Sequence, residues 1–574
     1  MKKVLPLMKK YRVYAILSPI FMILEVIADV VIPFLMAKIV NEGINNRDID
    51  YIVKVGIAMV VAAVLAMIFG IASSHCGARA GHGFASEIRN KTFKKIQGFS
   101  FSNLDDFTVS SLITRLTNDC NTIGQVTMMS LRMGIRAPSM FIFALIMAII
   151  LNPKVAILFA IAIPVMTVAI FIILKKSRPL FLKLQSRVDR VNAIIQENLT
   201  GIRVVKSFNR QEHEEKRFEK RNDRLRDTSL KAISLVLMLM PFLNLVIYSL
   251  IIAILWFGGK EVVAGSLGGG DLMALITYIS QVMMSIIIIS MFFMQFLRGS
   301  ASMQRINEVL DKDSEIQEID DKVYEVKDGS IIFKDVSFSY YDNKDYILKD
   351  IDFSIKSGET LGIIGSTGSS KSSLVQLIPR LYDVSEGAVL VGGVDVRDYD
   401  MKALRDQVAF VLQKNTLFSG TIRENMRWGK DDATDEEIIT ALKHSQAWEF
   451  VSEYEDGLDH RVEQGGDNFS GGQKQRLTIA RALLKDPKVI ILDDSTSAVD
   501  MTTDAKIQHA FKEELSHVTT IIIAQRVASI KEADRILVLH EGQIESIGDH
   551  ETLIKSSPIY REIHDSQEKG VIGE

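Results

Sequence analysis

Cysteine is nearly absent from this chain. Its 574 residues include two, Cys76 and Cys120. A disulfide framework needs several paired cysteines, and a zinc ribbon needs two closely spaced pairs, so both are excluded. We interpret the two cysteines as isolated, reduced thiols.

The chain also lacks an excess of charge of either sign. Its 67 lysines and arginines against 70 aspartates and glutamates leave a net charge of −3, which gives no indication of a nucleic-acid partner. The charged fraction of 24% argues against a chain that is disordered or wholly transmembrane. The mean hydropathy of +0.17 is nevertheless high for a soluble enzyme. We therefore expect two unlike parts.

The first part contains six strongly apolar runs. A helix that spans a membrane needs about 20 mainly apolar residues, and most of the runs reach that length. The third is long enough only if it begins near Val126 and includes Arg132 and Arg136. The first run is too long for a cleaved signal peptide and lacks a small-residue cleavage site. The runs cover residues 14–37, 55–73, 140–151, 155–174, 233–256 and 272–297.

Basic residues beside these runs indicate how the segments are oriented. A basic cluster before the first run places the N-terminus in the cytoplasm. The long connections 77–123 and 175–231 are polar and basic, so we expect them on the same side. Each contains a stretch with helical periodicity, 87–98 and 188–218, which predicts helices that extend into the cytoplasm and contact something there. The cluster before the first run is Lys2, Lys3, Lys9, Lys10 and Arg12.

The composition changes after about residue 308. A polar stretch, 311–328, is the predicted linker between a transmembrane domain at 1–310 and a second domain at 329–574. The second domain alternates strand-like and helical runs, which predicts a soluble α/β domain with a largely parallel sheet. The strand-like runs are 330–333, 359–364, 388–391, 408–412, 489–492, 519–524 and 535–540.

One of these strands leads into a loop of small residues with a lysine. In such a strand, loop and helix, backbone N–H groups and the helix dipole face a phosphate, the lysine reaches the outer phosphates, and a hydroxyl binds magnesium. The strict pattern has glycine immediately before Lys371, where this chain has Ser370, so the loop alone leaves an accidental turn as an alternative. The loop reads Gly365, Ser366, Thr367, Gly368, Ser369, Ser370, Lys371, Ser372, Ser373.

Two further motifs follow in the same domain. The apolar strand 489–492 ends in Asp493 and Asp494, where α/β sheets place ligand-binding residues, and we predict that Asp493 holds magnesium through water. Between the two motifs, Ser470, Gly471, Gly472 and Gln473 open a helical run. Alone, that tetrapeptide predicts a helix cap. Together and in this order, the three motifs are highly specific.

The chain resembles the ATP-binding-cassette (ABC) transporters over essentially its whole length, and the order of membrane domain then cassette is typical of exporters. The resemblance implies ATP and Mg²⁺ as cofactors, with Ser372, Gln413 and Asp493 around the metal. It implies that cytoplasmic coupling segments at 110–119 and 197–208 dock on the cassettes. It further implies Tyr340 as the adenine-stacking aromatic, 365–373 as Walker A, Gln413 as the Q-loop, Ser470, Gly471, Gly472 and Gln473 as the signature acting in trans, Asp493 as the Walker B aspartate, and 497–500 with Asp500 as the D-loop.

Three positions depart from the family pattern. Asp494 stands where a glutamate usually polarises the attacking water, and a misplacement of about 1 Å can cost on the order of 100-fold in rate. Gln525 replaces the switch histidine, and an amide cannot carry the charge of an imidazole. Ser370 replaces a glycine. If that position needs a positive φ, serine costs roughly 1–3 kcal/mol; if it does not, the change is neutral, and the sequence leaves both open.

All three departures fall in the chain's own ATP site, whereas its signature is intact. The resemblance therefore implies a heterodimer, in which a second, different half-transporter supplies a consensus glutamate and histidine and hydrolyses most of the ATP. This pattern resembles the degenerate-site half of bacterial heterodimeric multidrug exporters. The alternatives are a working ATPase with scattered substitutions, an ATP-binding regulatory half-subunit, and a homodimeric lipid or peptide exporter. Fusion of both domains in one chain disfavours an importer.

Two acidic residues lie inside the first apolar run. Glu25 and Asp29 are spaced i, i+4, so they share one helix face. Charges within a membrane span usually face a cavity or a partner. The functional hypothesis is an acidic substrate path that favours cationic compounds; the alternative is a structural contact to a polar residue of another helix. We expect a multi-pass protein of the cytoplasmic membrane, in contact with lipid, that exports a small amphiphilic or drug-like substrate and has its cassette in the cytoplasm.

Overall fold

The computed structural model describes residues 4–316, 321–340, 345–495 and 499–572. The chain divides into two compact units. The first comprises Met1–Gln97 and Val109–Lys312, and the second comprises Gly98–Thr108 and Asp313–Glu574. Part of the predicted linker thus belongs to the second unit. Val326 is buried in its core, and Val323 pairs with Tyr399.

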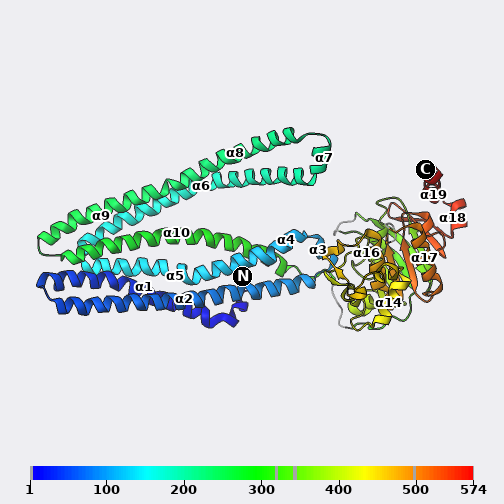
Figure 1. The fold of residues 1–574 in the computed structure, drawn as a ribbon, viewed down its shortest axis with the longest axis horizontal. Helices are drawn as coiled ribbons and strands as arrows, with labels where there is room; N and C mark the ends of the chain where they lie inside the picture. Colours follow the sequence, from blue (N-terminus) through cyan, green and yellow to red (C-terminus); the bar gives the residue numbers. More distant parts are fainter. Residues whose placement is uncertain (1–3, 317–320, 341–344, 496–498, 573–574) are drawn as a thin grey trace. The chain divides into compact units, whose positions relative to one another are not determined.

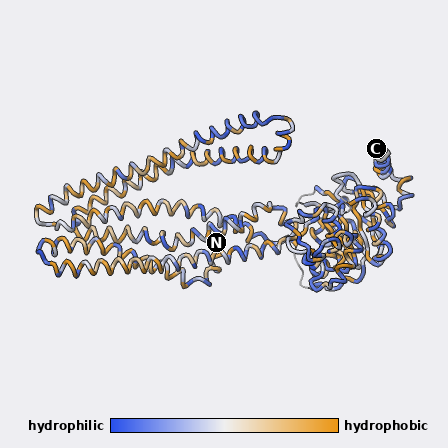
Figure 2. Tube along the Cα trace, in the orientation of Figure 1, coloured by the Kyte–Doolittle hydropathy of each residue, from blue (hydrophilic) through white to orange (hydrophobic). Residues whose placement is uncertain are grey.

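The first unit is helical, and its helices confirm the predicted six-helix membrane domain. Figure 2 shows apolar residues along much of their length and polar residues where α8 (Gln211–Leu237) approaches α7 (Ile202–Ser207). Six helical segments among the described residues are long and apolar enough to cross a membrane. They are Pro6–Ile44, Ile49–Gln97, Val109–Leu151, Pro153–Thr200, Gln211–Val263 and Gly269–Asp311.

Within this unit, α1, α2, α5 and α10 pack side by side, whereas α6 packs along α8 and α9 (Figure 1). The elements in chain order are η1 (Leu5–Tyr11), α1 (Arg12–Lys38), η2 (Ile39–Ile44), α2 (Ile49–Gln97), α4 (Val109–Thr114), η3 (Arg115–Asp119), α5 (Cys120–Leu151), α6 (Pro153–Thr200), α7 (Ile202–Ser207), α8 (Gln211–Leu237), α9 (Leu239–Val263) and α10 (Gly269–Asp311).

Local chemistry explains where the long helices begin and end. The side chain of Asn152 accepts hydrogen bonds from the N–H groups of Lys154 and Val155, and Pro153 occupies the first position of α6, where a missing N–H does no harm. The predicted helical stretch 188–218 is interrupted rather than continuous. Gly201 separates α6 from α7, and Asn209 adopts a φ of +51° before α8 begins.

The described part of the second unit contains two larger sheets and a small antiparallel pair, β7 with β8. A six-stranded sheet has the order β12-β11-β3-β10-β9-β6 and is parallel except for the edge strand β12, as predicted. A separate antiparallel sheet has the order β2-β1-β4-β5 and contains the predicted strands near 330 and 388. The strands are β1 (Ile331–Phe338), β2 (Leu348–Ile355), β3 (Thr360–Ile364), β4 (Glu386–Val391), β5 (Val394–Asp395), β6 (Val408–Val411), β7 (Gly420–Thr421), β8 (Arg461–Val462), β9 (Val489–Asp493), β10 (Thr519–Ile523), β11 (Arg535–His540) and β12 (Gln543–Gly548).

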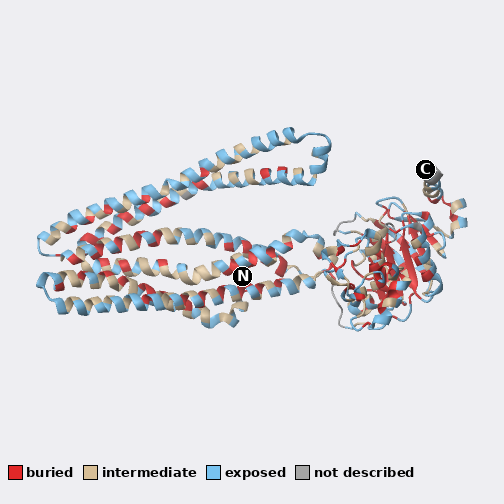
Figure 3. Ribbon diagram, in the orientation of Figure 1, coloured by how far each residue is buried: buried red, intermediate tan, exposed pale blue. Residues whose placement is uncertain are grey.

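The core of this unit lies on the central parallel strands (Figure 3). Every residue of β9 and β10 is buried, which explains why they appear as unbroken apolar runs rather than alternating ones. The helices of this unit are α3 (Phe101–Asp105), α11 (Lys371–Gln376), α12 (Met401–Gln407), α13 (Ile422–Arg427), α14 (Asp435–His444), α15 (Trp448–Val451), α16 (Gly471–Leu483), α17 (Met501–Glu513), α18 (His550–Ser556) and α19 (Pro558–Ile572), with short 3-10 turns at η4 (Gly457–Asp459), η5 (Gln464–Gly466) and η6 (Val527–Ser529).

Candidate functional site

The carboxyl ends of β3, β10 and β9 meet at one edge of the parallel sheet. In the register, Ile523 of β10 lies beside Ile363 of β3 on one side and Asp493 of β9 on the other. The loop 365–370, the pair Asp493–Asp494 and the segment after Ile523 therefore converge there. Parallel α/β sheets bind ligands at this edge.

The loop after β3 is shaped by glycine and closed by lysine. A Cβ on Gly365 would lie 2.1 Å from the carbonyl oxygen of Leu539, so no larger residue fits there. The Lys371 ammonium group donates to the carbonyl oxygens of Gly365 and Ser366 at 2.9 and 3.0 Å. Burial lowers the pKa of Lys371, against the opposing effect of Asp493 and Asp494. A partly desolvated lysine in a small-residue loop suits the binding of phosphate.

Ser370 adopts the left-handed conformation, with φ +69° and ψ +25°. This decides the question that the sequence leaves open, because the position before Lys371 does require a positive φ. Glycine takes this conformation without a steric penalty, whereas a residue with a Cβ is strained there by roughly 1–3 kcal/mol. The serine is therefore tolerated at a cost in stability.

The residues expected around magnesium include one close pair. The Ser372 hydroxyl donates to Asp493 Oδ1 at 3.0 Å. Asp493 is only 3% exposed, and its burial raises the pKa of the carboxyl group. A buried carboxylate beside a hydroxyl offers the hard oxygen ligands that Mg²⁺ prefers, so these residues fit the metal. The amide of Gln413 approaches Asp494 instead, with Nε2 3.5 Å from Oδ2.

Asp494 is held in place by its neighbours. Its backbone has a φ of +50°, and its N–H donates to the carbonyl oxygen of Ile523 at 3.0 Å. The side-chain amide of Gln525 donates to Asp494 Oδ2 at 2.7 Å. The two substituted positions thus contact each other directly.

The segment around Gln525 is braced from α19. Gln567 Nε2 donates to the Gln525 carbonyl oxygen at 2.7 Å, and Gln567 Oε1 accepts from the N–H of Val527 at 2.9 Å. Sequence analysis missed Gln567, because it is 42 residues from Gln525 and belongs to no motif. The side-chain amide of Gln567 thus pairs with a backbone acceptor and a backbone donor that flank Arg526.

Tyr340 lies beside the phosphate-binding loop. Its hydroxyl is 2.9 Å from the Ser373 hydroxyl, and its ring contacts Phe338 and Tyr382 edge to face. The ring stays 38% exposed, so part of it is open for stacking. The position fits the adenine-stacking role that the family resemblance implies.

The signature tetrapeptide begins α16. The Ser470 N–H donates to Gln473 Oε1 at 2.8 Å and the Gln473 N–H donates to Ser470 Oγ at 3.3 Å, which is a reciprocal capping box. Ser470 and Gly471 remain exposed. Asp500 caps α17 by accepting from the Thr503 N–H at 2.9 Å. Residues 497 and 498 of the predicted D-loop lie outside the described residues.

Comparison with known proteins agrees with this geometry. Residues 15–286 match the family model described as ABC transporter transmembrane region, and residues 348–497 match the one described as ABC transporter. The uncharacterized ABC transporter ATP-binding protein YfiB of Bacillus subtilis is 38% identical over 567 residues, 99% of this chain and 98% of that protein. The chain belongs to the ABC transporters.

One further relative and one solved structure are also similar to this chain. An ATP-dependent lipid A-core flippase of Desulfotalea psychrophila is 34% identical over 490 residues, 85% of each protein. The structure of a bacterial Atm1-family ABC exporter with ATP bound shares the fold, with a TM-score of 0.80, 24% identity, and coverage of 97% of this chain and 98% of that one. This ABC transporter is thus a half-transporter and a multi-pass membrane protein, with one membrane region fused to one cytoplasmic ATP-binding domain.

The two predicted coupling segments both belong to the first unit of this ABC transporter. Residues 110–119 lie in α4 and η3 of the first unit. The segment that packs within the cassette unit is α3, earlier in the chain. Phe101 contacts the ring of Tyr382, and Asp105 Oδ2 accepts from the Tyr382 hydroxyl at 2.8 Å. The second predicted segment, 197–208, covers the end of α6 and all of α7 and finishes at Phe208, which is 73% exposed.

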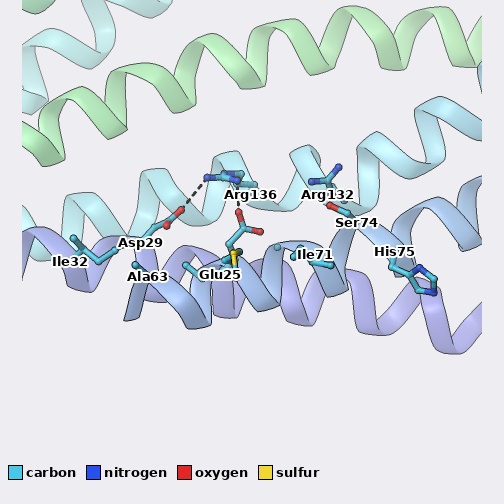
Figure 4. A pocket seen from close by; sticks show the side chains of 12 residues that line it. Glu25, Asp29, Ile32, Ala63, Ile71, Ser74, His75, Arg132 and Arg136 are labelled. Carbon is cyan, nitrogen blue, oxygen red and sulfur yellow. Dashed lines mark hydrogen bonds and ion pairs between the residues drawn. The ribbon is translucent and has the colours of Figure 1, made fainter. Parts of the chain in front are cut away.

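Glu25 and Asp29 line a cavity of about 770 Å³ between α1, α2 and α5 (Figure 4). Arg136 of α5 donates to both carboxylates, with Nη1 2.5 Å from Glu25 Oε1 and Nη2 3.0 Å from Asp29 Oδ2. This is the contact to another helix that the alternative hypothesis expects. The two carboxylates share one guanidinium, so the cavity wall is not simply acidic.

Proposed function

We propose that this ABC transporter is one half of a heterodimeric exporter whose own Walker A and B site binds ATP but hydrolyses it poorly. The observation that carries the proposal is the hydrogen bond between Gln525 and Asp494 at 2.7 Å. It joins the two positions at which the family usually has the histidine and the glutamate of hydrolysis.

The geometry around Asp494 disfavours its use as a general base. Aspartate is one methylene shorter than glutamate, so its carboxylate stays nearer the end of β9. The Gln525 amide already donates to Oδ2, which occupies an oxygen that would otherwise accept a proton from water. A base must lie within hydrogen-bond reach of the proton that it abstracts. Both effects lower the rate of hydrolysis without removing the groups that hold the nucleotide.

ATP binding has its own residues, and these are present. The loop 365–370 and Lys371 would hold the phosphates, and Tyr340 would stack on the adenine. Ser372 and Asp493 would hold Mg²⁺, which neutralises phosphate charge when it is bound. Their hydrogen bond of 3.0 Å positions these two oxygens beside the loop.

The signature supports the heterodimeric form. In the family, two cassettes sandwich ATP head to tail, so Ser470, Gly471, Gly472 and Gln473 face the nucleotide of the other subunit. Ser470 and Gly471 are exposed at the start of α16 and can accept such a contact. A chain with a weakened own site and an intact signature is suited to completing the site of a different half-transporter.

The test compares ATP hydrolysis by the purified chain alone with hydrolysis by the chain co-purified with a half-transporter that has the consensus glutamate and histidine. We expect little activity alone and robust activity in the pair. The double variant Asp494→Glu with Gln525→His should raise hydrolysis by the isolated chain by on the order of 10- to 100-fold. Asp494→Asn with Gln525→His serves as its control, because it restores the histidine without a carboxylate. Robust hydrolysis by the unmodified chain alone would refute the proposal.

A homodimeric lipid exporter is the second candidate. It is favoured by the 34% identity to the lipid A-core flippase of Desulfotalea psychrophila over 85% of this chain. It predicts that the chain alone, in liposomes, moves a fluorescent lipid between leaflets in an ATP-dependent manner. The heterodimer predicts ATP-driven export of an amphiphilic compound only when both subunits are present.

A further inference from the structure

The cavity between α1, α2 and α5 is lined by four charged side chains, which differ in their hydrogen bonds. Arg136 hydrogen-bonds to both Glu25 and Asp29. Arg132, one turn earlier on α5, also lines the cavity, and its buried Nε has no hydrogen-bond partner among the described residues. Figure 4 shows its guanidinium on the wall near Ser74, apart from the cluster formed by the other three.

The position of Arg132 is fixed by close packing of its stem. A Cβ on Gly77 of α2 would lie 3.2 Å from both Cγ and Cδ of Arg132, so this glycine makes room for the aliphatic part of the side chain. The Nε atom is buried without an acceptor. A guanidinium held inside a membrane span with a buried, unsatisfied N–H is costly unless an anion or another acceptor reaches it.

The rest of the lining is mostly apolar and well suited to a hydrocarbon chain. Ser74 and His75 lie on the same helix as Gly77 and add polar groups to the lining, and Ser74 is the one beside Arg132 (Figure 4). The volume of about 770 Å³ is in the range of cavities that bind small ligands. The apolar lining residues are Ile32, Ala63, Ala66, Met67 and Ile71.

We propose that this cavity is a binding site for an anionic amphiphile, whose phosphate or carboxylate headgroup binds Arg132 and whose chain lies on the apolar wall. The proposal rests on the proposed exporter function for the further statement that this compound is transported. Arg136 does not compete for the headgroup, because two carboxylates already occupy it. The cation preference suggested by Glu25 and Asp29 is thereby replaced by a preference for anions.

Glu25 provides the competing explanation. Its Oε2 is also buried without a hydrogen bond and lies against Gly70, where a Cβ would be 3.1 Å away. Two carboxylates share one guanidinium, so Arg132 could act only as a second, more distant counter-charge. In that case its removal would alter stability but would not discriminate between ligands by charge.

The experiment measures equilibrium binding of three probes with the same chain length: dodecyl phosphate, dodecanol and dodecyltrimethylammonium. The full-length protein, alone and with its partner half-transporter, is held in phosphatidylcholine nanodiscs without ATP. We expect dodecyl phosphate to bind best. Arg132→Gln should weaken its binding by on the order of 10- to 100-fold and leave dodecanol unchanged, because charge-assisted hydrogen bonds are lost. Arg132→Lys, which keeps the charge, should retain part of the affinity.

Arg79→Gln is the matched control. Arg79 is an arginine of the membrane unit on α2, and it does not line the cavity. Its Nη1 donates to the Tyr14 hydroxyl at 2.9 Å. This variant should bind dodecyl phosphate normally. Adding phosphatidylglycerol to the nanodiscs tests the source of the headgroup. If phosphatidylglycerol competes with dodecyl phosphate, the natural ligand is a lipid; if it does not compete, the ligand is a free amphiphile.

Thermal unfolding checks that Arg132→Gln and the unmodified protein are both folded. Equal binding of dodecyl phosphate by the two proteins would then overturn the proposal. Tighter binding of dodecyltrimethylammonium than of dodecyl phosphate by the unmodified protein would also overturn it. Because binding is measured without ATP, a failure of ATP-driven export would refute the proposed function and leave the binding result unaffected.

Discussion

At the scale of single residues, two of the three substituted positions in the nucleotide site lie in left-handed backbone. Ser370 has a φ of +69° and Asp494 a φ of +50°. Short polar residues such as aspartate tolerate this region better than most side chains. Asp494 therefore combines an acceptable backbone with a shorter reach, whereas Ser370 adds strain to a loop that the nucleotide must contact. The sequence identified both positions, but φ depends on how each loop closes.

The strain at Ser370 leads to the first prediction. Ser370→Gly should stabilise the protein by about 1 kcal/mol, because glycine adopts a positive φ without a steric penalty. Thermal unfolding of the full-length protein in detergent measures the change. Ser366→Gly is the control, since Ser366 lies in the same loop but does not have a positive φ. It should give no gain, and an equal gain from both variants would contradict the assignment of strain.

Gly365 carries the second prediction. Gly365→Ala places a methyl group 2.1 Å from the Leu539 carbonyl oxygen, so β3 and β11 must separate or the loop must shift. We expect a loss of about 1–3 kcal/mol in stability, as at other overpacked sites, and loss of ATP binding. Gly548→Ala, whose nearest neighbour would be 3.5 Å away, is the matched control. Binding of a fluorescent ATP analogue to both variants decides the outcome.

At the scale of elements, prediction from sequence succeeded where burial was uniform. β9 and β10 are apolar throughout because they are covered on both faces. β2 was missed, because its sequence Leu348–Ile355 carries exposed charged residues and one of its faces is open. α3 was missed because it has only five residues and no amphipathic period to detect. Its capping box, in which Ser100 and Asn103 exchange hydrogen bonds, was the one local signal.

The attachment of α3 gives the third prediction. Tyr382→Phe removes the hydroxyl that donates to Asp105 at 2.8 Å. Burial, assisted by that carboxylate, raises the pKa of Tyr382, so the hydroxyl stays protonated and able to donate at physiological pH. Loss of a hydrogen bond to a charged group costs about 1.5–3 kcal/mol. Hydrogen exchange of residues 100–106 should accelerate.

Tyr399→Phe is the control for this prediction. Tyr399 is buried in the same unit and its hydroxyl donates to the Val391 carbonyl oxygen at 2.9 Å. Its removal should lower stability without a selective effect on α3. If both variants change exchange in α3 equally, the bond to Asp105 is not what holds this helix.

The brace from α19 gives the fourth prediction. Gln567→Ala removes the acceptor for the Val527 N–H and the donor to the Gln525 carbonyl oxygen. At about 1 kcal/mol for each bond, amide exchange in residues 525–529 should become roughly 10- to 30-fold faster. Glu562→Ala, an exposed position on the same helix, should have no effect. Unchanged exchange in Gln567→Ala would show that the segment is held by other contacts.

At the scale of the whole molecule, two units of different physical character explain the mean hydropathy of +0.17. Large apolar side chains such as Ile57 and Phe171 are exposed on the first unit, because lipid rather than protein is the solvent around membrane helices. In the second unit the apolar residues gather on the sheets. Sequence patterns predicted both units, but the pairing of Arg136 with Glu25 and Asp29 links separate helices and has no local signal.

Whether the transporter is a heterodimer or a homodimer can be tested by inactivating the Walker A loop and the signature of this chain in separate variants. Lys371→Ala damages the Walker A loop of its own site, whereas Gly472→Glu places a charge in the signature at the start of α16. In a heterodimer whose partner performs the hydrolysis, Gly472→Glu should lower the ATPase rate of the pair by on the order of 100-fold, because it introduces a negative charge beside the partner's phosphates. Lys371→Ala should lower it by no more than roughly 3-fold, since its site contributes little turnover.

The same two substitutions placed in a homodimer have a different outcome, which makes the comparison decisive. There, each ATP site contains both the Walker A loop and the signature, so the two variants should lose activity to the same large extent. Lys474→Ala, one residue beyond the signature and paired with Asp467 at 3.3 Å, controls for a general disturbance of α16 and should retain most activity. Equal and severe losses from Lys371→Ala and Gly472→Glu would establish two equivalent sites and remove the asymmetry on which the heterodimer depends.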